Sequence, residues 1–389
     1  MGERKGRTAL GTQGTKGPVR VSEVGPGERP VFDAFVGHHP AGSVLQSWTW
    51  GELRGAQHWD AHRLLALDGA GAPCGAALAL CRQLPIGGSL LYLARGPVLD
   101  YRDGRVLDAM VAGLRRLGGR YHAILCKIDP PVTPPDPVVG RALRARGFIV
   151  GHRRGRFGGL QPRRNVIVPL DGGAEAVLAR CHGKTRYNIR LAVRRGVTVR
   201  RGGREDLATF HRLLMRTCAR NGFAERTLPY FQQVWDHLAA QDMAELHLAE
   251  LEGEAVAAGM LFCFGRHAVY AYGASGDAHR EAMAPYAVQW SMIQRACARG
   301  CLTYDMTGVP MKLEEGEPAY GLYRFKRGFW PEITEFQGEM DLPLQPSLYR
   351  LWRLAEPAWW GGQVWVRQRL RSVRALGAPG PADGAPPAA

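Results

Sequence analysis

Two stretches of the chain, one in each half, repeat the same order of structural signals. Residues 144–154 and 326–336 each give the end of a helix, an Arg-Gly-Phe turn and then a strand. The stretches before them, residues 122–131 (HAILCKIDPP) and 301–310 (CLTYDMTGVP), each give a strand followed by Asp or Thr and a proline turn. An internal repeat of this kind predicts a duplicated structural unit. We therefore expect two related halves.

Size and local patterns agree with that expectation. The 389 residues suit two domains of about 150–200 residues, and a hydrophobic fraction of 46% is ample for their cores. Residues 63–68, 74–81 and 123–128 have the pattern of strands, and residues 105–118 that of a helix. Their alternation predicts α/β layers, and the repeated closing segment is typical of an acyltransferase domain of the GNAT type.

Composition divides the chain into five segments. Residues 1–30 are rich in Gly, Lys and Arg and predict a flexible basic arm, and the ranges 31–165 and 166–345 are expected to be the two GNAT-like domains. Residues 346–375 form a Trp- and Arg-rich helical segment, which suits either contact with lipid headgroups or packing on the body of the protein. Residues 376–389 predict a disordered Pro/Ala/Gly tail.

Several classes of protein are excluded. No apolar run approaches the roughly 18–20 residues that span a bilayer, and residues 1–18 have no apolar core of a secretory signal. The eight cysteines are scattered without a CxxC pair or a histidine at zinc-ligand spacing. We expect a reduced, cytoplasmic protein without a metal or cofactor.

Positive charge is concentrated in one region. Between Arg141 and Arg204 there are 17 Lys and Arg against two acids, so most of the net charge of +16 lies there. This pattern predicts a polyanionic partner, although a solvated basic face is the plainer interpretation. Within it, residues 174–195 predict one helix, on which four cations fall within an arc of about 120°: Arg180, Lys184, Arg190 and Arg194.

Seven further segments carry a recognisable pattern: 46–53 (QSWTWGEL), 127–130 (KIDP), 184–197, Arg226-x3-Tyr230, 271–275 (AYGAS), 304–310 (YDMTGVP) and 321–329 (GLYRFKRGF). Together they resemble the Fem family (FemA, FemB, FemX), whose enzymes build the peptidoglycan interpeptide bridge from aminoacyl-tRNA. The resemblance covers about residues 40–345 and is closest to the FemX branch, which lacks a helical-hairpin arm. It implies two GNAT-like domains that face each other across a cleft.

The implied reaction moves an aminoacyl group from tRNA to the side-chain amine of the diamino acid in a UDP- or lipid-linked muropeptide precursor. The amine is itself the nucleophile, so positioning and charge stabilisation should dominate. Lys326 and Phe325 match the family's tRNA-end motif, where the ammonium would stabilise the oxyanion or terminal phosphate and the ring would stack on the 3′ adenine. Arg180, Lys184, Arg190 and Arg194 would bind the tRNA end. Asp129 would hold the acceptor amine and take its proton, unless it is an ordinary turn aspartate.

The acceptor would be held by cations and tyrosines. Arg226 and Tyr230 match the family's phosphate-binding pattern, and Arg54 stands near the place of a family lysine. Tyr270 and Tyr272 flank Ala271 in a strand, and we expect one in the cleft and one in the core, with Tyr272 the better candidate because it abuts a turn. Glu339 matches an acid near the family's site, but an exposed glutamate is an alternative.

Two other functions remain open from the sequence. The first is an N-acyltransferase with another activated donor, although a pyrophosphate-binding loop for acyl-CoA is missing. The second is a non-catalytic RNA- or membrane-binding module. The transferred amino acid, a lysine or ornithine acceptor, and peripheral contact with the inner membrane leaflet also remain open.

Overall fold

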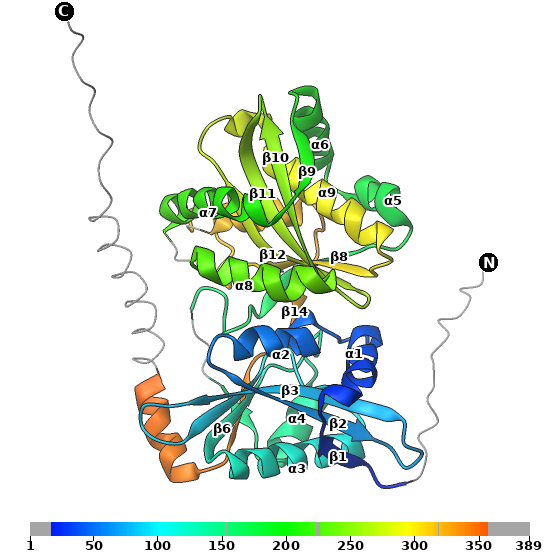
Figure 1. Cartoon of the computed structure of the whole chain (residues 1–389), viewed down its shortest axis with the longest axis vertical. Coiled ribbons are helices and arrows are strands. Elements are labelled where there is room, and N and C mark those ends of the chain that lie inside the picture. Colours follow the sequence, from blue (N-terminus) through cyan, green and yellow to red (C-terminus); the bar gives the residue numbers. More distant parts are fainter. Residues whose placement is uncertain (1–16, 152–154, 223–225, 318, 357–389) are drawn as a thin grey trace, which may run out of the picture.

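A computed structural model describes residues 17–151, 155–222, 226–317 and 319–356. It contains two stacked halves, each built on one mixed sheet with helices on both faces (Figure 1). The first sheet has the strand order β1-β2-β3-β4-β6-β15-β7, with β5 paired to β3. These strands are β1 (Arg20–Glu23), β2 (Asp60–Leu67), β3 (Pro73–Gln83), β4 (Ser89–Leu93), β5 (Val98–Leu99), β6 (Ala123–Ile128), β7 (Ile149–Val150) and β15 (Met340–Pro343).

The second sheet repeats this plan in the order β14-β8-β13-β12-β11-β10-β9. Each sheet contains a parallel pair next to its centre, β4 with β6 and β12 with β13, and β15 and β8 occupy equivalent places beside those pairs. The two related halves expected from the repeat are therefore present. The strands are β8 (Arg164–Pro169), β9 (Thr198–Gly202), β10 (Ala244–Leu251), β11 (Glu254–Phe264), β12 (His267–Ser275), β13 (Thr303–Gly308) and β14 (Thr334–Glu335).

Helices cover both faces of each sheet, and the inner helices of the two halves share one hydrophobic core. Phe32, Leu53 and Leu78 of the first half belong to the same buried cluster as Phe231 and Met260 of the second. This shared core holds the two halves together. The helices are α1 (Arg29–His38), α2 (Trp48–Gly55), α3 (Gly104–Arg120), α4 (Pro137–Ala145), α5 (Gly173–Arg180), α6 (Gly183–Arg194), α7 (Leu207–Asn221), α8 (Leu228–Leu238), α9 (Ala284–Ala298) and α10 (Tyr320–Arg327).

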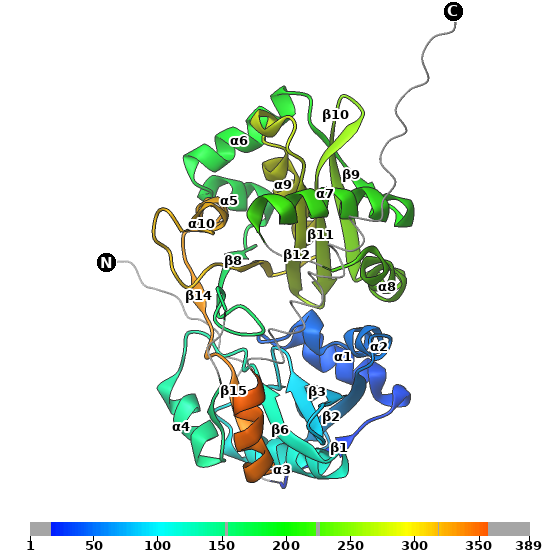
Figure 2. The ribbon, with the colours of Figure 1, turned by 90° about the vertical axis from the view of Figure 1, so that its left-hand side faces the viewer.

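The segment boundaries differ from those expected. Residues 20–23 of the expected flexible arm form β1, which pairs with β2. The range 166–345 contains β15, yet β15 pairs with β6 and β7 and so completes the first sheet (Figure 2). This crossing could not be found from local patterns, because strand pairing between distant residues leaves no signal in either segment alone.

The C-terminal segment begins with a helix over residues 346–356 that packs on the first half. Trp352 is buried, and the Tyr349 hydroxyl donates to Asp341 of β15 at 2.9 Å. This part therefore follows the expectation of packing on the body. Residues 357–375 and the expected tail 376–389 lie outside the described residues.

The helix expected over residues 174–195 is two helices, α5 and α6. Cys181 is extended, and the His182 side chain caps α6 by accepting from the Lys184 N–H at 3.2 Å. Arg186 donates to the carbonyls of Ala179 and Cys181, which satisfies backbone acceptors at the end of α5. The break removes Arg180 from the ridge predicted for one continuous helix.

Candidate active site

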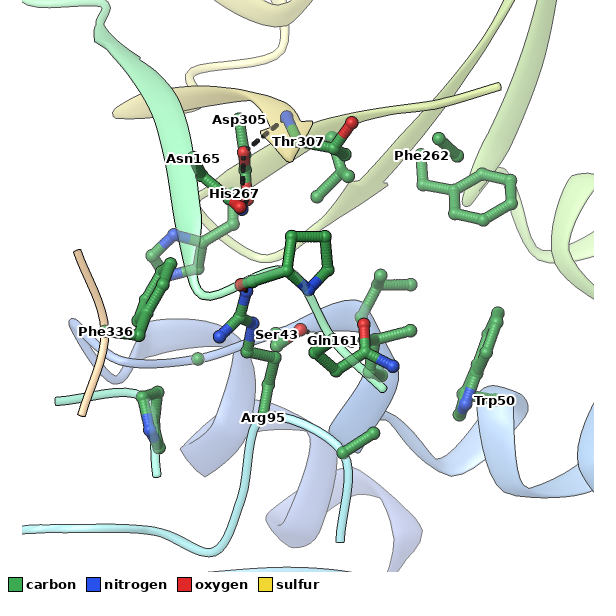
Figure 3. Close-up of a pocket in the computed structure, with 18 of the residues that line it drawn as sticks. Ser43, Trp50, Arg95, Gln161, Asn165, Phe262, His267, Asp305, Thr307 and Phe336 are labelled. Atoms are coloured by element: carbon green, nitrogen blue, oxygen red, sulfur yellow. Dashed lines mark hydrogen bonds between the residues drawn. The ribbon is translucent and has the colours of Figure 1, made fainter. Parts of the chain in front are cut away.

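A cavity of about 800 Å³ lies between the two halves. Its floor comes from the first half, from the segment 40–45, α2, β3 and the end of β4, and its roof comes from β8, β12, β13 and α8. Figure 3 shows Arg95, Ser43 and Trp50 on one wall and Asn165, Asp305 and Thr307 on the other. A cavity of this size, formed where two domains meet, is a common place for a ligand site.

Four residues predicted to bind the acceptor line one part of this cavity: Arg54, Arg226, Tyr230 and Tyr272. The hydroxyls of Tyr230 and Tyr272 are 2.8 Å apart, and the Arg226 guanidinium lies 5.1 Å from the centre of the Tyr230 ring. The structure thus brings together side chains that are up to 218 positions apart in the sequence, from 54 to 272.

Arg54 is held in place by two neighbouring side chains, Gln57 and Trp59. Its guanidinium donates to Gln57 at 2.6 Å and lies 5.3 Å from the centre of the Trp59 ring. Burial lowers the pKa of Arg54, and the nearby cations of Arg226 and Arg82 add to that effect. Arg82 also lines the cavity and lies 5.4 Å from the same Trp59 ring. Three gathered guanidiniums suit a diphosphate.

Tyr270 lies away from the cavity, in the core of the second half. Residues two apart on a regular strand share a face, so the expected divergence of Tyr270 and Tyr272 needs an irregularity. The ladder between β11 and β12 supplies it, because Leu261 pairs with Tyr270 and Met260 with Tyr272, which leaves Ala271 as an extra residue. Tyr272 faces the cavity as favoured, but a bulge is the reason.

Asp129 follows β6 and is buried behind Arg95. Its Oδ2 lies 3.3 Å from Arg95 Nη1, and burial raises the pKa of Asp129 while Arg95 opposes the rise. Arg95 lines the cavity, donates to the Pro162 carbonyl at 2.6 Å and lies 3.8 Å from the centre of the Phe336 ring. The Asp129 carboxylate therefore faces an arginine rather than the cavity itself.

Asp305 lies on the opposite wall, in β13. The Asn165 amide nitrogen is 3.0 and 2.8 Å from its two carboxylate oxygens, and the Thr307 N–H donates to it at 2.6 Å (Figure 3). Burial raises the pKa of Asp305, and Arg95 is the strongest influence that lowers it. Arg95 of the first half thus interacts with a carboxylate of each half.

Lys326 completes this charged group. It lies in α10 with 3% of its surface exposed, and its Nζ donates to the Gly308 carbonyl at 2.8 Å and to Thr307 Oγ1 at 3.3 Å. Burial lowers the pKa of Lys326 to about 7, and the charge of Asp305 opposes that fall. The lysine points inward and lies behind Thr307 of the cavity wall.

Family membership follows from comparison with known proteins. The FemAB family model matches residues 28–136, 147–255 and 252–357. The chain belongs to the FemAB family. This FemAB protein is 27% identical over 409 residues to Lipid II:glycine glycyltransferase of Staphylococcus aureus (strain USA300), a match that covers 87% of this chain and 97% of that protein.

A solved structure agrees with the sequence comparison. The crystal structure of FemX matches with a TM-score of 0.79 and 26% identity, over 85% of this chain and 99% of that one. The expected Fem resemblance, the two tandem GNAT-like domains and the assignment as an aminoacyltransferase are confirmed. The substrates and the roles of individual residues remain predictions for this FemAB protein.

The residues predicted to bind the tRNA end lie outside the cavity lining. Phe325 packs against Tyr286 and Phe329, with ring centres 4.9 and 5.5 Å away. Arg180, the last residue of α5, is held by the segment before that helix. It pairs with Asp171 at 2.9 Å and donates to the Pro169 carbonyl. The exposed cations that remain on α6 are Lys184, Arg190 and Arg194, which we call the α6 ridge.

Glu339 is buried rather than exposed, and it also lies outside the cavity lining. It accepts a hydrogen bond from the Leu160 N–H, and Leu160 lines the cavity. Lys127 Nζ lies 3.8 Å from Glu339, 2.6 Å from Asp341 and 3.7 Å from Glu356. Burial raises the pKa of Glu339 to about 7, against the influence of Lys127. Glu339 therefore supports the cavity wall from behind.

Sequence reasoning missed Arg95, Asp305 and Thr307 as individual site residues. Asp305 and Thr307 lay within the segment YDMTGVP that carried the resemblance, and its alignment with HAILCKIDPP put Asp129 and Thr307 in corresponding turns. Arg95 precedes Gly96-Pro97 and has a φ of 51°, an unusual conformation that no sequence pattern announced.

Neither a metal site nor a membrane span is found in the part of the chain that the structure describes. No three His, Cys, Asp or Glu side chains gather there in a way that could hold a metal ion. Among the same residues, no helix is long and apolar enough to cross a bilayer.

Proposed function

We propose that this FemAB protein transfers an aminoacyl group from aminoacyl-tRNA to the side-chain amine of the diamino acid in a peptidoglycan precursor. The observation that carries the proposal is the cavity between the halves. Three arginines line one part of it, and Arg95 and Asp305 line another, with Asp129 behind Arg95 and Lys326 behind Thr307. The similarity to a Lipid II:glycine glycyltransferase supports a precursor of the peptidoglycan bridge as acceptor.

The arginines of the cavity would bind the acceptor. The precursor carries a diphosphate whether it is UDP-linked or lipid-linked, and Arg54 and Arg226 would hold it with charge-assisted bonds. The hydrogen-bonded pair Tyr230 and Tyr272 would line the path from there toward the reacting amine. Binding energy gained in this part of the cavity would position the amine for attack.

The charged group around Arg95 would promote the acyl transfer. The neutral amine nitrogen attacks the ester carbonyl carbon, and the carbonyl oxygen becomes an oxyanion. The bond to the ribose oxygen then breaks as that oxygen takes up the proton that the attacking nitrogen gives up. The Lys326 ammonium would stabilise the negative charge from behind the wall. Asp129 would act through Arg95, which it holds at the cavity surface, since its carboxylate pairs with that guanidinium.

The α6 ridge and the C-terminal segment would bring the two substrates to the cavity. The ridge would contact tRNA phosphates outside the cavity, and Phe325 would reach the 3′ adenine only if it left its ring cluster. A lipid-linked acceptor would bring the protein to the inner leaflet of the membrane, where Trp and Arg of residues 357–375 suit the headgroup region. We expect a cytoplasmic protein with such peripheral contact.

One experiment tests the proposal directly. Purified protein is incubated with charged tRNA pools and either the UDP-linked or the lipid-linked precursor, and the products are weighed by mass spectrometry. A precursor heavier by one or more aminoacyl residues is expected. The proposal would be overturned if neither acceptor gained an aminoacyl residue. An adduct formed from acyl-CoA without tRNA would show that acyl-CoA is the donor instead.

A pair of lysine variants makes this assay specific. Lys326→Ala should abolish transfer and leave tRNA binding nearly unchanged. Lys312→Ala is the matched control, because Lys312 is exposed and pairs only loosely with Glu317 at 3.7 Å. Equal activity of the two variants would remove Lys326 from the mechanism.

A further inference from the structure

Lys326 does not itself reach the cavity surface, and Thr307 stands in front of it. Thr307 lines the cavity, whereas Lys326 is not among the lining residues. The two side chains meet at 3.3 Å between Nζ and Oγ1. Any influence of the lysine on a bound ester therefore passes beside or through this hydroxyl.

The backbone of Thr307 is in an unusual conformation. Its φ is 64°, in the left-handed region that a β-branched residue rarely occupies. The same place carries an irregular register, because β13 and β8 pair regularly up to Asp305 and resume only at Gly308. Bulges of this kind redirect side chains and are frequent near active sites. Strained residues persist only where their surroundings hold them firmly.

Two side chains of the cavity wall, Asp305 and Asn165, provide that firm hold. Asp305 accepts the Thr307 N–H at 2.6 Å, and Asn165 fixes Asp305 by approaching both of its carboxylate oxygens. Asn165 has 2% of its surface exposed and Asp305 is half-buried, so little of this support can move. Figure 3 shows the three residues together on the wall of β8 and β13. The arrangement specifies the position of one hydroxyl in the cavity.

A hydroxyl in this place can do what the ammonium behind it cannot. It accepts a hydrogen bond from Lys326 Nζ and remains free to donate its own hydrogen to another oxygen. A donor fixed before the reaction, and polarised by a neighbouring cation, is well suited to an oxyanion that forms in the transition state.

We propose that the Thr307 hydroxyl is a catalytic residue, which donates a hydrogen bond to the oxyanion that forms when the acceptor amine attacks the aminoacyl ester. Asp305 and Asn165 are its positioning residues, and Lys326 polarises it. This inference rests on the proposed function. The hydroxyl keeps its proton throughout: the oxyanion forms from the carbonyl electron pair and is lost when the bond to the ribose oxygen breaks.

The test compares three replacements at this position. Thr307→Val keeps the β-branched shape and removes the hydroxyl, and we expect kcat to fall about 10²-fold, as for the loss of one oxyanion donor, with the KM values within about twofold. Thr307→Ser keeps the hydroxyl and should retain kcat within about threefold. Thr307→Gly removes the hydroxyl and relieves the positive φ, so it should show the loss of Thr307→Val even if the valine variant folds poorly.

Controls separate this role from a structural one. Thr198→Val, on the exposed edge strand β9, should leave kcat unchanged. Thermal unfolding of Thr307→Gly should match or exceed that of the wild type while its kcat stays low. Full activity of Thr307→Val and Thr307→Gly, or a serine variant as impaired as the valine variant, would overturn the inference. Absence of any transfer by the wild type would instead overturn the proposed function.

Discussion

The hydroxyl of Tyr230 on α8 and that of Tyr272 on β12 are 2.8 Å apart at the surface of the cavity. Either hydroxyl can donate to the other. Tyr270, only two positions earlier, is half-buried against the core of the second half, where desolvation of its hydroxyl raises its pKa to about 12. The bulge at Ala271 thus gives the two tyrosines of one strand separate surroundings.

Replacing either member of the pair should weaken acceptor binding. We expect Tyr230→Phe and Tyr272→Phe each to raise the acceptor KM about 3–10-fold, the equivalent of one hydrogen bond. The double variant should be little worse than either single one, because both changes break the same bond. Steady-state kinetics of the four proteins measures this coupling. Tyr270→Phe is the control and should leave the acceptor KM unchanged.

Charge at position 54 should matter more than the identity of the cation. Arg54→Met removes one charge-assisted bond to the proposed diphosphate and should raise the acceptor KM about tenfold. Arg54→Lys, which restores the family's lysine, should recover most of that loss. Arg116→Met, on the outer surface of α3, serves as a control. An acceptor KM unaffected by Arg54→Met would place the diphosphate elsewhere.

The α6 ridge should account for the salt dependence of tRNA binding. Each phosphate contact that is lost lowers the slope of log K against log salt by about one, so reversing the charge of Lys184, Arg190 and Arg194 should lower it by up to about three. Filter binding at several salt concentrations measures the slope. Arg180→Ala should leave it unchanged, because Arg180 is already paired with Asp171. An unaltered slope in the triple variant would exclude the ridge as the contact surface.

Local patterns predicted the elements of the fold well. The strands expected over 63–68, 74–81 and 123–128 correspond to β2, β3 and β6, and the helix expected over 105–118 is α3. Periodicity and glycine turns are local signals, so they appear in the sequence itself. The crossing of β15 into the first sheet depends on pairing with β6, more than 200 residues away, and it was missed.

Cavity residues that belong to family motifs could be predicted from the sequence. Contacts that depend only on the three-dimensional arrangement could not. Arg54, Arg226, Tyr230 and Tyr272 came from the resemblance and meet in the cavity. Asp129 was expected to face the acceptor amine, but its carboxylate pairs with Arg95 at 3.3 Å, and that partner could not be inferred without coordinates. The break at Cys181 was also missed, because residues 174–195 were interpreted as one continuous helix.

Lys326 should destabilise the fold at neutral pH, and Lys326→Met should reveal this. The lysine has a pKa of about 7 in the folded protein and 10.5 as its ordinary value, so the unfolded chain binds more protons between these pH values and stability rises with pH there. Below pH 7 both states carry the charge and the full cost of burying it applies. Above pH 10.5 Lys326 is uncharged in both the folded and the unfolded state, so the cost of burying the charge disappears.

The difference in stability between Lys326→Met and the wild type should therefore depend on pH. It should be largest at pH 6, where the interval from 10.5 to about 7 sets an upper bound of about 5 kcal/mol, and should shrink steadily toward pH 10. Urea unfolding at pH 6, 8 and 9.5 measures it, with Lys312→Met as a control whose difference should be flat. If the difference in unfolding free energy between Lys326→Met and the wild type did not change with pH, the ammonium would be stabilised as fully in the folded protein as in water. A variant that gains stability while it loses transfer would instead identify Lys326 as a residue kept for catalysis at the expense of the fold.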